Sequence, residues 1–179
     1  MRQQGFSLIE LLMGLAIAAI VLPWAGTGYK ELIESIERKD AAQLLISGLR
    51  SARSEAITRN RRVLIQGIDN DWGNGWRIML DNKEKTLLME RSSRARVAGN
   101  SPVKRRVRFG SHGAALHANG SFQAGTLHVC AKRGPVSHHQ VILAPSGRVR
   151  LESIKAEQAL CEKGLKAASG RATPSASRT

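Results

Sequence analysis

The feature that most constrains this chain is a long apolar stretch close to its N-terminus. Across residues 6–26 the only charged side chain is Glu10. At 1.5 Å of rise per residue, a helix of this length spans the hydrocarbon core of a bilayer, which is about 30 Å thick. The stretch is longer than the apolar region of a typical signal peptide, and no Ala-x-Ala cleavage pattern follows it. We therefore expect a membrane anchor that remains in the mature protein.

Glu10 is unusual, because a carboxylate within an apolar span is costly and usually functional. The alternative is a side chain near the interface that extends to water. The segment Gly5-Phe6-Ser7-Leu8-Ile9-Glu10 resembles the prepilin cleavage motif of type IV pilins and type II secretion pseudopilins.

This resemblance implies that a membrane prepilin peptidase removes a leader, residues 1–5, after Gly5. Phe6 then becomes the N-methylated N-terminus, and Glu10 pairs with the Phe6 ammonium of a neighbouring subunit in the filament. The pairing is physically reasonable, since a buried carboxylate gains from a desolvated cation only where the register supplies one.

The basic leader predicts the orientation of the chain, because positive flanks remain in the cytoplasm. We expect a single-pass protein of the bacterial inner membrane with a periplasmic C-terminal domain, which becomes extracellular once assembled into a pilus. The two cysteines, Cys130 and Cys161, would then meet an oxidising compartment. They are expected to form a disulfide, and two free buried thiols are the alternative.

The rest of the chain predicts one amphipathic helix followed by short strands. Within residues 29–58, apolar side chains recur at a spacing of three to four residues. These are Ile33, Ile36, Leu45, Leu49, Ala52 and Ala56. Strands are expected at residues 63–66, 76–80, 86–90, 107–109, 125–130, 137–143 and 148–151, with a hairpin loop at 69–75. The expected organisation is a leader (1–5), a transmembrane and assembly helix (6–28), a globular domain (29–161) and a flexible basic tail (162–179).

Several later segments are similar to the GspH/FimT group of minor pilins. They are Trp72-Gly73-Asn74-Gly75-Trp76, Gly120-Ser121-Phe122, Gly125-Thr126-Leu127 with Cys130, Val141-Ile142-Leu143 and Gly147-Arg148-Val149-Arg150. This resemblance implies an α+β pilin fold, in which a long N-terminal helix packs on antiparallel β-sheet structure. It also implies a minor rather than a bulk subunit, with other major and minor pilins as partners.

A net charge of +14 suggests a polyanion or an anionic membrane as a further partner. Residues 147–150 match a Gly-Arg-x-Arg motif that is associated with DNA binding in FimT-like members. In a strand, Arg148 and Arg150 face the same side, roughly 6.5–7 Å apart, which matches the scale of phosphate spacing along DNA. Gly147 allows the turn to place them at an edge. The alternative is an ordinary turn followed by an exposed strand.

Two other basic segments are weaker candidates for DNA contact. Residues 91–108 are taken as one basic loop with seven Lys or Arg residues and no acid, and Arg105 and Arg106 lie among them. Lys132 and Arg133 occupy a short loop after Cys130. For each segment, a solvated basic surface is the alternative.

Enzymatic and metal chemistry have no support in the sequence. No nucleophile elbow, zinc-protease motif or phosphate-binding glycine loop occurs, and the five histidines lack a metal-ligand spacing. We expect no catalytic residue, no metal and no cofactor. Two functions remain open: a minor pilin that binds DNA for uptake in natural transformation, and a structural minor pilin or pseudopilin that primes assembly without binding DNA.

Overall fold

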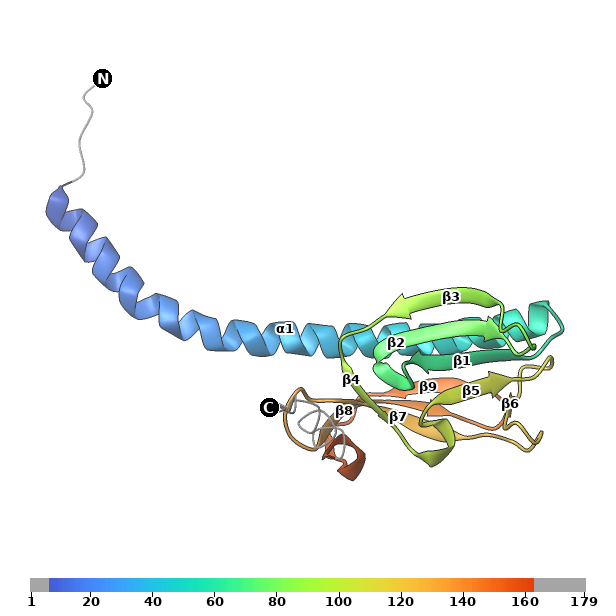
Figure 1. Cartoon of the computed structure of the whole chain (residues 1–179). Coiled ribbons are helices and arrows are strands. Elements are labelled where there is room, and N and C mark those ends of the chain that lie inside the picture. The colour runs from blue at the N-terminus through green and yellow to red at the C-terminus, as the bar shows by residue number, and fades with distance from the viewer. Residues whose placement is uncertain (1–6, 163–179) are drawn as a thin grey trace, which may run out of the picture. The chain divides into compact units, whose positions relative to one another are not determined.

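The computed structural model describes residues 7–162, which divide into two compact units after Ile36. Helix α1, Leu8–Thr58, begins in the first unit and ends in the second (Figure 1). Gly5 and Phe6 of the cleavage motif lie outside the described residues. The same holds for the leader and for residues 163–179 of the expected tail.

The first unit is the N-terminal part of α1. Glu10 lies in its first turn, and the large apolar side chains from Leu8 to Ile20 are 57–75% exposed. Within the part of the chain that the structure describes, no helix combines the length and the mean hydropathy required of a membrane span.

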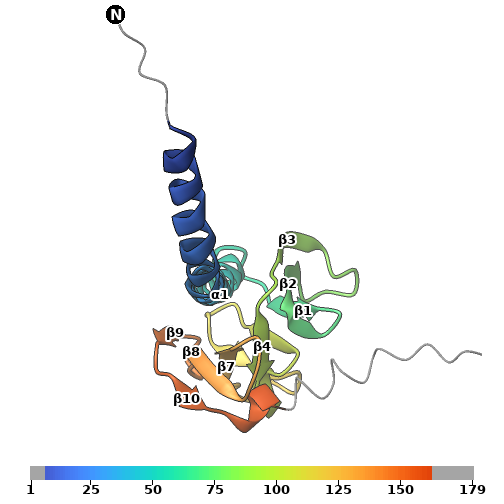
Figure 2. The ribbon, with the colours of Figure 1, turned by 90° about the vertical axis from the view of Figure 1, so that its left-hand side faces the viewer.

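The second unit packs the C-terminal half of α1 against two antiparallel sheets. Leu45, Leu49, Ala52 and Ala56 are buried, as the amphipathic pattern predicts. Ile36, the last residue of the first unit, departs from that pattern, because its side chain is 47% exposed. In Figure 2 this half of α1 is seen nearly end-on, with strands β1–β3 (residues 63–92) to one side and strands β7–β9 (residues 125–152) below it.

The first sheet has the strand order β3-β2-β1-β5-β6, and the second has the order β10-β8-β7-β4, with β9 paired to β8. The strands of the first sheet are β1 (Val63–Ile68), β2 (Asp71–Leu80), β3 (Leu87–Ser92), β5 (Arg106–Phe109) and β6 (Ala115–Leu116). Those of the second are β4 (Arg96–Gly99), β7 (Gly125–Cys130), β8 (Val136–Leu143), β9 (Val149–Glu152) and β10 (Ala156–Glu157). A single 3₁₀ turn, Ser101–Val103, connects β4 with β5 among the described residues.

Two sequence expectations about loops are wrong. The hairpin loop is not 69–75, because β2 begins at Asp71 and pairs with Ile68 of β1. Asp69 and Asn70 both have positive φ, 54° and 62°, which is what a two-residue hairpin turn requires. The basic segment 91–108 is not one loop either, since it contains β4, the 3₁₀ turn and β5.

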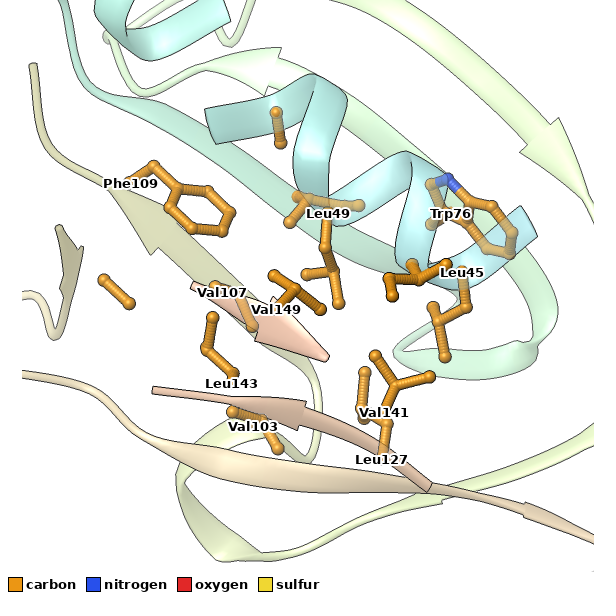
Figure 3. Packing of buried hydrophobic residues seen from close by; sticks show 14 of the residues in the cluster. Leu45, Leu49, Trp76, Val103, Val107, Phe109, Leu127, Val141, Leu143 and Val149 are labelled. Carbon is orange, nitrogen blue, oxygen red and sulfur yellow. The ribbon is translucent and has the colours of Figure 1, made fainter. Parts of the chain in front are cut away.

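The core lies between α1 and the two sheets. Figure 3 shows Leu45 and Leu49 of α1 close to Phe109, Val141 and Val149, which come from both sheets. Each fully buried side chain of this size contributes about 1.5–3 kcal/mol. Val149 is 6% exposed and belongs to this core, so it fixes which face of β9 points outward.

Candidate nucleic-acid interface

The turn between β8 and β9 is closed by backbone hydrogen bonds. The amide of Gly147 donates to the carbonyl of Ala144, and the amide of Ala144 donates to the carbonyl of Arg148, both at 2.9 Å. Gly147 has φ +77°, and a Cβ placed there would lie 1.8 Å from the carbonyl oxygen of Gly113. Only glycine fits this position, because both the backbone conformation and the close approach exclude a side chain.

Arg148 and Arg150 are exposed on either side of the buried Val149. Arg150 lies in β9 and Arg148 directly precedes it, so the alternation of side chains around the buried Val149 places both arginines on the side away from the core. Arg150 Nε lies 3.3 Å from Glu152 Oε1, and these side chains are 61% and 36% exposed. Such a solvated ion pair is weak, so it leaves Arg150 able to exchange Glu152 for another anion.

Two arginines of α1 support the same turn. Arg50 Nη2 donates to the carbonyl of Val149 at 3.4 Å, and Arg53 Nε donates to the carbonyl of Gly113 at 3.0 Å. Neither arginine stands out in the sequence, because the contact of Arg50 lies 99 residues away along the chain and that of Arg53 lies 60 residues away. The structure therefore gathers four arginines around one hairpin.

Lys132 and Arg133 lie far from this hairpin. They occupy the turn before β8, whereas Gly147 follows its other end, and a strand of eight residues is about 26 Å long. Lys132 Nζ also forms an ion pair with Glu37 Oε2 at 2.8 Å.

Arg105 and Arg106 are also separated from the β8–β9 turn. They lie at the start of β5, whereas Gly113, which lies against Gly147 of that turn, follows the end of β5. Together with Lys104 and Arg108 they line an open surface groove of about 650 Å³. The structure thus separates the predicted DNA-binding residues into three places: the β8–β9 turn, the β7–β8 turn and this groove.

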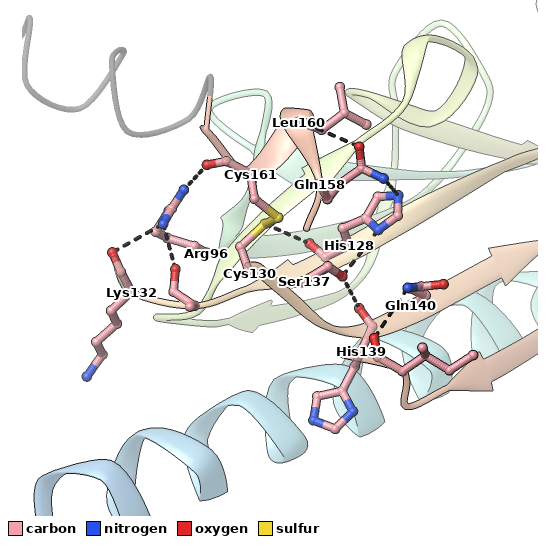
Figure 4. Close-up of a disulfide and its surroundings, with 12 residues drawn as sticks. Arg96, His128, Cys130, Lys132, Ser137, His139, Gln140, Gln158, Leu160 and Cys161 are labelled. Carbon is pink, nitrogen blue, oxygen red and sulfur yellow. Dashed lines mark hydrogen bonds between the residues drawn. A yellow bond between two sulfur atoms is a disulfide. The ribbon is translucent and has the colours of Figure 1, made fainter. Parts of the chain in front are cut away.

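A disulfide joins Cys130, at the end of β7 in the second sheet, to Cys161 (Figure 4). The expected pairing of the two cysteines is therefore confirmed. Beside it, the guanidinium of Arg96 donates to the carbonyl oxygens of Ala131, Lys132 and Cys161. Burial lowers the pKa of Arg96. Arg96, which belongs to the basic segment 91–108, therefore holds the C-terminal residues rather than presenting its charge to a ligand.

His128 is buried below the same C-terminal segment. One ring nitrogen lies 3.2 Å from Ser137 Oγ and the other lies 3.4 Å from Gln158 Nε2. Burial lowers the pKa of His128. Among residues 7–162, no group of three or more His, Cys, Asp or Glu side chains is arranged to hold a metal ion.

The long helix packed on antiparallel sheets is the α+β fold of type IV pilins. The family model described as Type II transport protein GspH matches residues 41–147, which is more than half of the chain. The model described as the prokaryotic N-terminal methylation motif matches residues 1–22. The chain therefore belongs to the GspH family of minor pilins and pseudopilins. Its methylation motif implies processing by a prepilin peptidase, membrane anchoring and association with other pilins.

Solved structures show the same fold. The type IV minor pilin FimU of Pseudomonas aeruginosa, in space group P21, is 22% identical to this chain. The match covers 72% of this chain and 97% of FimU, with a TM-score of 0.56. A second crystal form, P65, gives a TM-score of 0.54 at 22% identity, covering 69% of this chain and 98% of FimU. A search of curated proteins found no significant match.

Proposed function

We propose that this minor pilin assembles into a type IV pilus and binds DNA without sequence preference, for uptake in natural transformation. The β8–β9 turn is the binding site, with Arg148 and Arg150 as the phosphate ligands. In this function the chain resembles the FimT-like minor pilins. The observation that carries the proposal is the pair of exposed arginines on either side of the buried Val149, at the start of β9 and directly after the glycine turn.

The chemistry of this surface suits a phosphodiester backbone. Arginine donates in a planar fork that matches two phosphate oxygens, and its charge persists at any physiological pH. Arg50 and Arg53 of α1 add positive charge close to the turn, because their guanidinium groups donate to the carbonyls of Val149 and Gly113. Contacts of this kind are independent of base sequence and weaken as salt rises, because binding releases counterions from DNA.

A binding titration tests the proposal. The purified full chain, kept in non-ionic detergent, would be titrated with two unrelated DNA duplexes at several salt concentrations. We expect equal affinity for both sequences. In the Arg148→Glu/Arg150→Glu variant, binding should be lost at moderate salt. Milder Arg→Gln replacements should lower the slope of log affinity against log salt by about 2.

A matched control separates the site from net charge. Lys83→Glu/Lys85→Glu makes the same charge change at an exposed turn between β2 and β3. This control should retain duplex binding. If both double variants lose affinity equally, only the overall charge matters and the β8–β9 turn is not the site.

The second candidate function is a structural subunit that primes a type IV pilus or a type II secretion pseudopilus without binding DNA. It is favoured by the match to a family described as a type II transport protein and by the methylation motif. In this function, as in the first, Glu10 would pair with the N-terminal ammonium of a neighbouring subunit. Glu10→Ala should then prevent incorporation into filaments, and normal incorporation would refute this role.

A further inference from the structure

The first sheet carries an exposed aromatic side chain at one edge. Phe122 is 68% exposed, whereas Trp72, Trp76 and Phe109 are at most 2% exposed. It follows a tight turn in which the amide of His117 donates to the carbonyl of Ser121 at 2.8 Å. The ring of Phe122 is therefore open to solvent and accessible to a ligand.

Phe122 lies in register with the arginines of β5. Arg108 of β5 pairs with Leu116 of β6, and Leu116 forms an isolated bridge with Phe122. Residues paired across antiparallel strands project from the same face, and residues two apart along a strand do so as well. Arg106, Arg108 and Phe122 therefore share one face, with Arg108 and Phe122 roughly 10 Å apart at their Cα atoms.

The basic groove lies against this edge. Its lining includes Lys104, Arg105, Arg106, Arg108 and His117, with no carboxylate among the lining residues. Arg108 is partly neutralised by Asp81, whose Oδ2 lies 2.8 Å from its Nε. Within residues 7–162, no ion pair engages Lys104, Arg105 or Arg106, so three cations are available to an anion.

Gln123 makes the floor of the groove rigid. This side chain is 3% exposed, and its amide nitrogen donates to the carbonyls of Pro102 at 2.6 Å and Arg106 at 3.0 Å. Its amide oxygen accepts from the backbone amide of Arg108 at 3.2 Å. The side chain of Gln123 thus ties Pro102, Arg106 and Arg108 of the groove together before any ligand arrives.

We propose that this groove binds single-stranded nucleic acid, with phosphates against Lys104, Arg105 and Arg106 and a base stacked on Phe122. Aromatic platforms beside cationic grooves bind single strands without sequence preference, because every base has a stacking face. In a duplex those faces are already stacked on their neighbours, so Phe122 gains nothing from intact double-stranded DNA. This inference rests on the proposed DNA-binding function, but it uses a surface separate from the β8–β9 turn.

Fluorescence anisotropy on the full chain in non-ionic detergent tests the inference. The three probes are a labelled oligothymidine of about 12 nucleotides, an abasic oligomer of the same length and a duplex. Phe122→Ala should weaken oligothymidine binding about fivefold or more, while affinities for the abasic oligomer and the duplex stay unchanged. Phe122→Trp should retain binding of oligothymidine and show quenching of its indole fluorescence.

Charge variants complete the test. Lys104→Glu/Arg106→Glu should weaken binding of both single-stranded probes, whereas Lys83→Glu/Lys85→Glu should not. Unchanged oligothymidine affinity in Phe122→Ala would overturn the inference, and so would equal weakening of all three probes. Duplex binding that depends on Arg148 and Arg150 without any effect of Phe122 would leave the proposed function intact and refute only the groove.

Discussion

Replacing Gly147 by alanine should destabilise the globular unit well beyond the ordinary cost of a turn substitution. The left-handed conformation at φ +77° costs a residue with a side chain about 1–2 kcal/mol. In addition, the new Cβ would lie 1.8 Å from the carbonyl oxygen of Gly113 and 3.2 Å from Arg53 Nε. Separating the first pair to an acceptable 3.0 Å requires a backbone shift of about 1.2 Å.

Such a shift would stretch two hydrogen bonds that hold the turn. One joins the amide of Gly147 to the carbonyl of Ala144, and the other joins Arg53 to the carbonyl of Gly113. Each contributes about 1 kcal/mol. Together with the conformational cost, the loss is about 3–4 kcal/mol, which lowers the melting temperature of a unit of this size by roughly 10 °C.

Gly134→Ala is the matched control. Gly134 also has positive φ, +82°, but a Cβ there meets no atom within 4 Å. This variant should therefore lose only the conformational term, about 1–2 kcal/mol. Thermal unfolding of both variants with the disulfide intact, followed by circular dichroism, measures the difference between their melting temperatures. Equal melting temperatures would show that the contact between residues 147 and 113 does not constrain the turn.

Three further predictions concern the disulfide, pH and the acid beside the turn. Cys161→Ser removes a cross-link over a sequence separation of 31 residues, so denaturant unfolding should show a loss of up to about 3.7 kcal/mol. Because burial lowers the pKa of His128 below 6.5, the unfolded chain takes up its proton first. The free energy of unfolding should therefore fall as the pH drops below about 6.5, and His128→Gln should flatten this dependence in melting curves recorded from pH 7 to 5. Glu152→Gln frees Arg150 from its ion pair, so duplex titrations at low salt should show tighter binding, and unchanged affinity would argue against Arg150 as a ligand.

Parts of the fold could be predicted from the sequence because their patterns are local. The second half of α1 shows its apolar stripe directly. β7 has its expected bounds, and β8 begins one residue before the expected start. β4, β6 and β10 were missed, since they have only two to four residues each, and β4 and β10 also pair with strands that are not their neighbours in the chain. Arg96–Gly99, for example, becomes a strand by pairing with β7, which is a tertiary contact that no local propensity reveals.

The candidate site, too, could be predicted only in part from the sequence. The turn glycine and the two arginines after it are adjacent in sequence, so their motif is visible without a structure. Arg50 and Arg53 join that turn only through contacts with residues 149 and 113. Phe122 was noted in the sequence as part of a family resemblance. Its register with Arg108 depends on the pairing through Leu116, which the sequence does not display.

Residues 91–108 show why counting charges does not locate a binding site. The sequence gives no reason to treat Arg96 and Arg106 differently. In the structure, however, Arg96 donates to backbone carbonyls, whereas Arg106 lines an open surface groove. Arg108 already has a carboxylate partner in Asp81. Replacing Arg96 should therefore change the stability of the disulfide-linked end, and replacing Arg106 should change the binding of anions. Whether a cation of this segment can bind an external anion is decided by its neighbours in the fold. The total charge of residues 91–108 does not distinguish Arg96 from Arg106.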